Sequence, residues 1–150
     1  MNIPQQDENV PALPGRVLAL DVGRKRIGLA ISDALGITAQ GLPTLERVRI
    51  REDLAHLAQL AQAREVTLFL LGNPLHMSGR ESRQGEYVKE FGERLALHTG
   101  IPVAYWDERL TSVEAGRVLR SSGIGIEKRA RAIDQLSAVL ILENYLERQC

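Results

Sequence analysis

Two apolar segments near the start of the chain, joined by a short polar turn, constrain the fold more than any other feature of the sequence. Residues 16–22 and 27–32 each have strand length, and the residues between them are Gly23, Arg24, Lys25 and Arg26. Such a short link favours antiparallel pairing of the two strands. Asp21 interrupts the first segment, and a buried carboxylate costs on the order of several kcal/mol unless a partner compensates it. A hydrogen-bonded turn, an arginine or a divalent cation could be that partner.

The rest of the chain alternates between helical and strand patterns. Apolar residues at Ile50, Leu54, Leu57 and Ala61 follow the spacing of an amphipathic helix, whereas the apolar run 66–71 is typical of a buried central strand. We expect further strands over 37–45 and 103–106, and further helices before Gly100, from Thr111 and over 127–146. The sequence predicts an α/β fold: a mixed sheet of about five strands with helices on both faces.

The length of the chain favours one domain, and its balanced charge argues against a bulk electrostatic attraction to nucleic acid. The 150 residues include 19 basic and 19 acidic side chains, so the formal net charge is zero. We expect the polar, Pro-rich residues 1–15 to form a disordered tail and residues 16–150 to form a single domain. No apolar stretch approaches the roughly 20 residues that span a bilayer. The lone cysteine, Cys150, excludes an internal disulfide, and these features together predict a cytoplasmic protein.

Acidic residues stand at three places where they could converge on one site. Asp21 and the Asp107-Glu108 pair end predicted strands, where ligands of open α/β sheets usually bind. Asp134 lies early in the last predicted helix, on a face with small residues that would allow close approach to the sheet. Because strand side chains alternate between faces, we expect only one of Asp107 and Glu108 to face Asp134. Such an all-oxygen site suits Mg²⁺ or Mn²⁺, and two ions about 4 Å apart can promote phosphodiester cleavage.

Each acid also has a purely structural explanation. Asp21 could cap the turn that follows it, and Asp107 is expected to form a local salt bridge. Glu108 could be a solvated charge at a strand end, and Asp134 could interact with the helix macrodipole. A metal site explains the three positions together, whereas the structural explanations are independent of one another.

Four segments of the sequence form an ordered set of motifs. They are Asp21-Val22-Gly23 with Ile27-Gly28-Leu29-Ala30; Gly72-Asn73-Pro74-Leu75 with Met77 and Gly79; Asp107-Glu108-Arg109-Leu110-Thr111; and Asp134-Gln135 with Ala138-Val139-Leu140-Ile141-Leu142. In this order they resemble the motifs of the YqgF-type pre-16S rRNA nuclease family, whose members are also called Holliday junction resolvases. Each motif is weak by itself, but four in order over residues 16–146 are specific.

The resemblance implies a ribonuclease H-like fold and metal-dependent endonuclease activity on structured nucleic acid, with maturation of the 16S rRNA 5′ end as the assigned role. It places the catalytic, metal-binding acids at Asp21, Glu108 and Asp134, with Mg²⁺ or Mn²⁺ as the cofactor. Two positions depart from the family pattern: Asn73 replaces a leucine, and Ser78 stands where an acidic or amide residue is frequent. Both lie in the loop that follows the fourth predicted strand, so they affect substrate contacts more than metal binding.

Basic residues near the predicted strand ends are candidates for phosphate contacts, because a polyanionic substrate must approach the acids. The nucleic-acid-binding residues that we expect are Arg24, Lys25, Arg80 and Arg109. The alternative for such residues is a set of solvated side chains paired with nearby glutamates. His76 is an auxiliary candidate for proton transfer, and Asp107 is an auxiliary acid. We interpret the turn residues 24–26 as too exposed to be the best partner of Asp21.

Other function classes fit the sequence less well. The spacing of Gly23 and Gly28 matches a P-loop, but Leu29 and Ala30 follow where Lys and Ser or Thr are required. An actin-like ATPase would need two lobes, and this chain has room for one. A four-way DNA junction stays open as the substrate, as does a non-catalytic nucleic-acid-binding or ribosome-binding module. We expect nucleic acid as the partner, no membrane association, and a monomer or homodimer.

Overall fold

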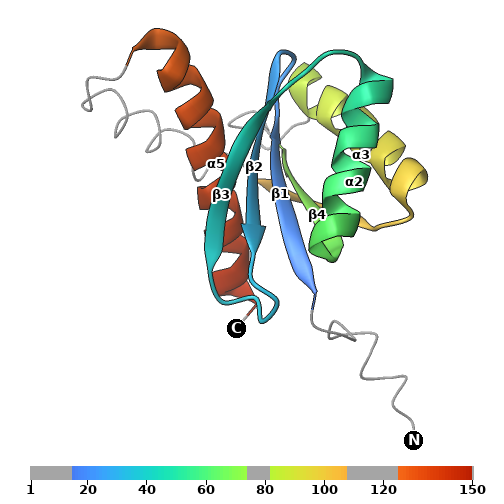
Figure 1. The fold of residues 1–150 in the computed structure, drawn as a ribbon, viewed down its shortest axis with the longest axis vertical. Coiled ribbons are helices and arrows are strands. Elements are labelled where there is room, and N and C mark those ends of the chain that lie inside the picture. Colours follow the sequence, from blue (N-terminus) through green and yellow to red (C-terminus); the bar gives the residue numbers. More distant parts are fainter. Residues whose placement is uncertain (1–14, 74–81, 108–124, 150) are drawn as a thin grey trace, which may run out of the picture.

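A five-stranded mixed sheet forms the centre of the fold (Figure 1). The computed structural model describes residues 15–73, 82–107 and 125–149. The strands are β1 (Arg16–Val22), β2 (Arg26–Ser32), β3 (Ala39–Glu46), β4 (Val66–Asn73) and β5 (Val103–Asp107), in the sheet order β3-β2-β1-β4-β5. The first three form an antiparallel meander, whereas β4 runs parallel to β1 and β5 runs parallel to β4. This topology confirms the predicted mixed sheet.

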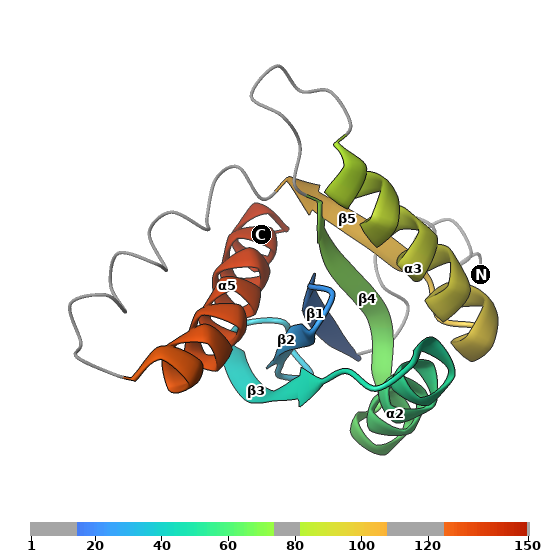
Figure 2. The same cartoon turned by 90° about the horizontal axis from the view of Figure 1, so that it is seen from above.

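Helices cover both faces of the sheet. α2 (Ile50–Arg64) and α3 (Arg83–Thr99) lie on one face, and α5 (Ile126–Arg148) lies on the other (Figure 1, Figure 2). Strand alternation divides the buried apolar side chains between two cores. The core on the α2–α3 face includes Leu18, Leu20, Ile27, Phe69 and Leu71. The core on the α5 face includes Ala19, Ala30, Leu70, Ala138, Ile141 and Leu142. Its alanines let α5 lie close to the strands.

Local signals determine where α2 and α3 begin and end. The Ser82 side chain accepts a hydrogen bond from the Gly85 amide at 2.9 Å, which caps the start of α3. α3 ends at Gly100, which is left-handed with φ of 76°, and α2 ends at the left-handed Glu65 with φ of 58°. β4 follows α2, and β5 follows α3. The C-terminal ends of these two strands therefore lie at the same edge of the sheet as that of β1.

Two strand boundaries differ from the prediction by two residues, and the others agree within one residue. β3 starts at Ala39 and not at residue 37, because the Asp33 carboxylate accepts hydrogen bonds from the amides of Ile37 and Thr38 and holds them in the preceding turn. β4 extends to Asn73, two residues beyond the predicted end, because its last residues pair with β5. Residues 1–14 of the expected tail and the helix predicted from Thr111 lie outside the described residues.

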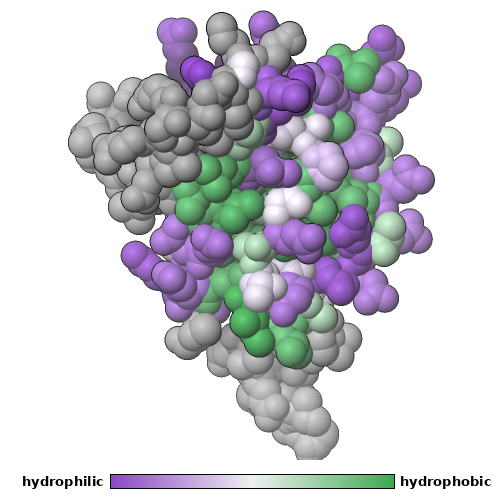
Figure 3. Space-filling model, turned by 60° about the vertical axis from the view of Figure 1, so that its left-hand side comes forward, coloured by the Kyte–Doolittle hydropathy of each residue, from purple (hydrophilic) through white to green (hydrophobic). Residues whose placement is uncertain are grey.

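The surface on the α5 side mixes apolar and hydrophilic side chains. Apolar surface gathers in the middle of this face and is bordered by hydrophilic surface (Figure 3). Several apolar residues of α5 are only partly buried, among them Ile133, Leu136 and Leu140. An apolar character that extends around a helix is typical of packing on more than one side. Within the described ranges, no helix is long and apolar enough to cross a membrane.

Candidate active site

Asp21 lies at the C-terminal end of β1, the edge of the sheet where β4 and β5 also end. Val17 and Ala19 belong to the core on the α5 face, so alternation along β1 places Asp21 on that face too. The residue is half-buried. Partial removal from water raises the energy of a carboxylate anion, which makes this position favourable for a neighbouring cation.

Gly28 brings the backbone of Asp134 next to Asp21. It pairs with Asp21 across the antiparallel ladder between β1 and β2. A Cβ atom built on Gly28 would lie 1.9 Å from the Asp134 carbonyl oxygen and 3.0 Å from the Asp134 Cα. Only glycine allows the backbone of α5 to approach β2 this closely. The structure therefore brings two of the three predicted acids to one place.

Arg26 is the partner of the Asp134 carboxylate. Its Nε donates to Asp134 Oδ2 at 2.8 Å, and the two side chains are 30% and 21% exposed, respectively. Burial raises the pKa of Asp134, the hydrogen bond and charge of Arg26 lower it, and the charge of Glu46 raises it. The ion pair alone would lower the pKa of Asp134, but the effect of burial is larger, so the pKa is raised overall. The ionised carboxylate is thus incompletely compensated, which favours a further cation.

Contacts with β3 hold this part of α5 on the sheet. Gln135 Nε2 donates to the Leu42 carbonyl at 2.7 Å, and Thr44 Oγ1 donates to the Arg131 carbonyl at 2.9 Å. These two contacts flank Asp134 along the helix. They hold α5 against β3 on both sides of Asp134, whereas Arg26 contacts the Asp134 carboxylate itself.

Asp107 belongs to the other face of the sheet. Val103 and Tyr105 pack against the core on the α2–α3 face, whereas Ala104 and Trp106 pack on the α5 face. Alternation along β5 therefore places Asp107 on the face opposite Asp134. Glu108, the other member of the pair, lies outside the described residues. In the part of the chain that the structure describes, no group of three or more His, Cys, Asp or Glu residues could hold a metal ion.

The predicted basic residues have different outcomes. Arg24 and Lys25 are exposed in the β1–β2 turn, and the Arg24 guanidinium lies 4.3 Å from the centre of the Tyr87 ring. The expectation that the whole turn is exposed is wrong for Arg26, because β2 begins there and directs its side chain onto Asp134. The expected contacts at Arg80, Arg109 and His76 lie outside the described residues.

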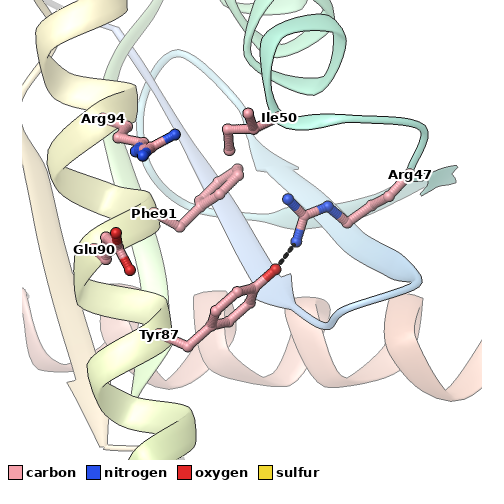
Figure 4. Close-up of a pocket in the computed structure, with 6 residues that line it drawn as sticks. All are labelled: Arg47, Ile50, Tyr87, Glu90, Phe91 and Arg94. Atoms are coloured by element: carbon pink, nitrogen blue, oxygen red, sulfur yellow. Dashed lines mark hydrogen bonds between the residues drawn. The ribbon is translucent and has the colours of Figure 1, made fainter.

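A buried arginine that has no recognisable sequence signal holds the β1–β2 turn. Arg47 Nε and Asp53 Oδ2 are 2.9 Å apart, and the two side chains are only 9% and 2% exposed. Arg47 also donates to the Gly23 carbonyl at 2.9 Å and to the Tyr87 hydroxyl (Figure 4). Its amide donates to the Lys25 carbonyl at 2.9 Å. From sequence, Asp53 reads as an ordinary first-turn acid of a helix, and nothing links it to Arg47.

The same arginine lines a small cavity next to α3. The cavity has a volume of about 190 Å³ and is lined by Arg47, Ile50, Tyr87, Glu90, Phe91 and Arg94 (Figure 4). It lies on the α2–α3 side of the sheet, opposite the face that carries Asp134. We therefore treat the cavity as separate from the acid pair.

Comparison with known proteins identifies a family. The family model described as "RuvX: Holliday junction resolvase" matches residues 15–148. A Koribacter versatilis protein named "Putative pre-16S rRNA nuclease" is 53% identical over 138 residues, which cover 92% of this chain and 90% of the relative. A Clostridioides difficile protein of the same name is 43% identical over 90% of this chain and 96% of its own length.

Solved structures of resolvases share the fold at much lower identity. RuvC of Thermus thermophilus, in complex with a Holliday junction substrate, matches with a TM-score of 0.58 and 13% identity, over 90% of this chain and 95% of its own. Fowlpox virus resolvase, in complex with Holliday junction DNA, matches with a TM-score of 0.57 and 10% identity, over 89% and 98% of the two chains. These likenesses confirm the predicted ribonuclease H-like fold.

Proposed function

The chain belongs to the RuvX family, and on that premise we propose that it is a metal-dependent endonuclease that cleaves structured nucleic acid. One observation carries the proposal. The backbone of Asp134 packs against Gly28, which pairs with Asp21, so that two half-buried carboxyl-bearing residues flank one glycine near the C-terminal end of β1. A merely structural role would not require the helix backbone to approach the strand so closely at an acidic residue.

The donor set fits a hard divalent cation. Asp21 and Asp134 would supply carboxylate oxygens, which Mg²⁺ and Mn²⁺ prefer. Burial that raises the pKa of Asp134 leaves an anion in need of positive charge. We propose Glu108 as the third ligand and not Asp107, because Asp107 lies on the face opposite Asp134 and the motif resemblance implies Glu108. When bound, the cation would activate water and stabilise the leaving oxygen at the scissile phosphate.

The chain's own residues would orient the substrate around this site. Arg24 and Lys25 are exposed in the turn that follows β1, where they are available to phosphates of the substrate. Arg47 holds the backbone of that turn through the Gly23 and Lys25 carbonyls. Phosphate contacts made from a rigid turn position the strand without reading its sequence. Arg80, Arg109 and His76 stay candidates for further contacts and for proton transfer.

We propose pre-16S rRNA as the substrate, because the relatives that are 43–53% identical are named pre-16S rRNA nucleases, and the motif resemblance points to its 5′ end. A four-way DNA junction is the second candidate, because the family model and the resolvases of similar fold carry that description. For either substrate we propose that the chain acts in the cytoplasm, where nucleic acids and divalent cations are both present.

The test offers both substrates to the purified full-length chain. Labelled pre-16S rRNA ends and four-way junctions are incubated with Mg²⁺, with Mn²⁺ or with a chelator, and the products are resolved on a denaturing gel. Metal-dependent cleavage that Asp21→Asn abolishes supports the proposal, and the substrate that is cut identifies the role. Cleavage that persists with the chelator would contradict the mechanism. If the chain binds both substrates and cuts neither, a non-catalytic module is the better description.

Asp33→Asn is a matched control for this test. Asp33 follows β2 at the opposite end from Gly28, and the substitution makes the same charge change in the same hairpin. Asparagine keeps a side-chain oxygen that can accept the bonds from Ile37 and Thr38. Asp33→Asn should therefore cleave at the wild-type rate.

A further inference from the structure

We propose that Arg26 is a resident counter-ion of the acid pair, which holds Asp134 in the metal-free protein and yields this carboxylate to a divalent cation when nucleic acid binds. The inference rests on the proposed function, because it assumes that Asp134 is a metal ligand. It adds a regulatory property: Arg26 lowers the metal affinity of the free protein, and bound nucleic acid raises that affinity.

Geometry places Arg26 on the carboxylate of Asp134. Arg26 and Gly28 lie on the same face of β2, and Gly28 carries the backbone of Asp134, so the arginine reaches the carboxylate directly. The bond of 2.8 Å between Arg26 Nε and Asp134 Oδ2 occupies one of the two oxygens with which Asp134 could bind a cation. A guanidinium and a divalent cation repel each other, so a cation bound by this carboxylate weakens its contact with Arg26, and Arg26 weakens the binding of the cation.

A second arginine–aspartate pair in the same region shows what a permanent structural pair looks like. Arg47 and Asp53 are only 9% and 2% exposed, and Arg47 additionally binds the Gly23 carbonyl and the Tyr87 hydroxyl. The side chains of Arg26 and Asp134 are 30% and 21% exposed. Solvent access at both members lets the Arg26 pair open without leaving a fully buried charge, in contrast to the Arg47 pair.

Opening this pair has a cost that subtracts from metal affinity. Each carboxylate–guanidinium contact that breaks must be replaced by hydration of the guanidinium or by another anion. A phosphate group of the substrate is such an anion, and arginine binds phosphate well. Nucleic acid should therefore tighten metal binding, and by thermodynamic reciprocity metal should tighten the binding of nucleic acid.

The neighbouring turn residues provide matched controls. Arg24 and Lys25 carry the same charge as Arg26 and are exposed, and Arg24 stacks on Tyr87. Loss of one positive charge near the site acts in all three variants. Loss of the contact with Asp134 acts only at position 26.

The experiment measures Mn²⁺ binding to the full-length chain by calorimetry and by electron paramagnetic resonance, without nucleic acid. Arg26→Gln should bind Mn²⁺ about tenfold more tightly than wild type, the change expected when one charge-assisted hydrogen bond no longer competes. Arg24→Gln and Lys25→Gln should stay within about twofold of wild type, because exposed charges act weakly. Arg26→Lys, which keeps the charge but not the planar fork, should fall between wild type and Arg26→Gln. Thermal unfolding checks that each variant folds.

The outcomes separate the inference from the proposed function. Equal or weaker Mn²⁺ binding in folded Arg26→Gln overturns the inference alone, because Arg26 would then orient Asp134 and not compete for it. Absence of Mn²⁺ binding in wild type and in every variant overturns the proposed metal site and the inference with it. Binding in Arg26→Gln but not in wild type supports both. A wild-type Mn²⁺ affinity that an added 20-nucleotide RNA or DNA strand does not raise would contradict the coupling.

Discussion

The carbonyl oxygen of Asp134 lies directly over Gly28, so closely that a Cβ atom at position 28 would stand 1.9 Å from it. This contact joins the last helix to the first hairpin at the proposed catalytic edge. Gly28 therefore sets how closely α5, which carries Asp134, approaches the strand pair that carries Asp21.

Gly28→Ala should destabilise the protein and abolish cleavage. The methyl group would push α5 away from β2, and such overpacking costs about 1–3 kcal/mol, with more where backbone must move. Urea denaturation measures the loss, and the cleavage assay measures activity. Gly41→Ala is the control: its Cβ would meet the flexible side chain of Gln135 at 2.8 Å and not backbone, so its effect should be clearly smaller. Equal effects of the two substitutions would contradict this account.

Arg47→Gln should lower the free energy of unfolding by about 3–5 kcal/mol, because it leaves the carboxylate of Asp53 buried without a counter-charge. Urea denaturation at neutral pH measures the change. Arg49→Gln is a matched control two residues away: Arg49 and Glu52 are 71% and 53% exposed and 3.7 Å apart, so its loss should cost less than about 1 kcal/mol. A cost for Arg47→Gln as small as that of Arg49→Gln would show that the buried pair contributes little.

In the metal-free protein, Asp134→Asn should increase the free energy of unfolding relative to wild type, and this increase should be larger at pH 7 than at pH 4. Burial raises the pKa of Asp134 in the folded state, so the folded chain binds a proton that the unfolded chain releases at about pH 4. Wild type therefore loses stability as the pH rises through the interval above pH 4, whereas the asparagine variant lacks this loss. The measurement is urea denaturation with a chelator at both pH values. A difference between the two proteins that shrinks toward pH 7 would give the pKa shift the opposite sign.

Arg24→Gln and Lys25→Gln should each weaken the binding of nucleic acid without sequence preference. Removal of one phosphate contact lowers the slope of log affinity against log salt by about one. Fluorescence anisotropy with a labelled strand at several salt concentrations gives this slope. Arg64→Gln, at the C-terminal end of α2 and at the opposite edge of the sheet, makes the same charge change and should leave the slope unaltered. A slope that is unchanged in all three variants would exclude the turn from the interface.

Most of the fold could be predicted because it depends on local patterns. Apolar runs of strand length, helical spacing and the end at Gly100 identified the strands and helices within a few residues. Alternation along the last strand also predicted that only one of Asp107 and Glu108 would face Asp134. The prediction differed at the start of β3, where the carboxylate of Asp33 competes with the strand for the amides of Ile37 and Thr38. Pattern alone does not reveal that competition.

The candidate site could be predicted only in part. The acids at Asp21 and Asp134 carry a sequence signal, because a carboxylate within an apolar pattern is unusual. The partners of the acids carry none. Arg26 resembles its neighbours Arg24 and Lys25 in sequence, and Arg47 resembles any basic residue after a strand.

The sequence by itself determined the order of the described strands and helices and supplied the acids that we propose for a metal site. Tertiary structure alone decided which charges meet. Arg26 and Asp134 are 108 residues apart, and they touch because α5 packs against β2 at a glycine. Hydrophobic periodicity depends on residues that are close in the sequence, so the sequence alone reveals it. An ion pair between distant elements depends on how closely two surfaces pack, and only the folded molecule specifies that distance.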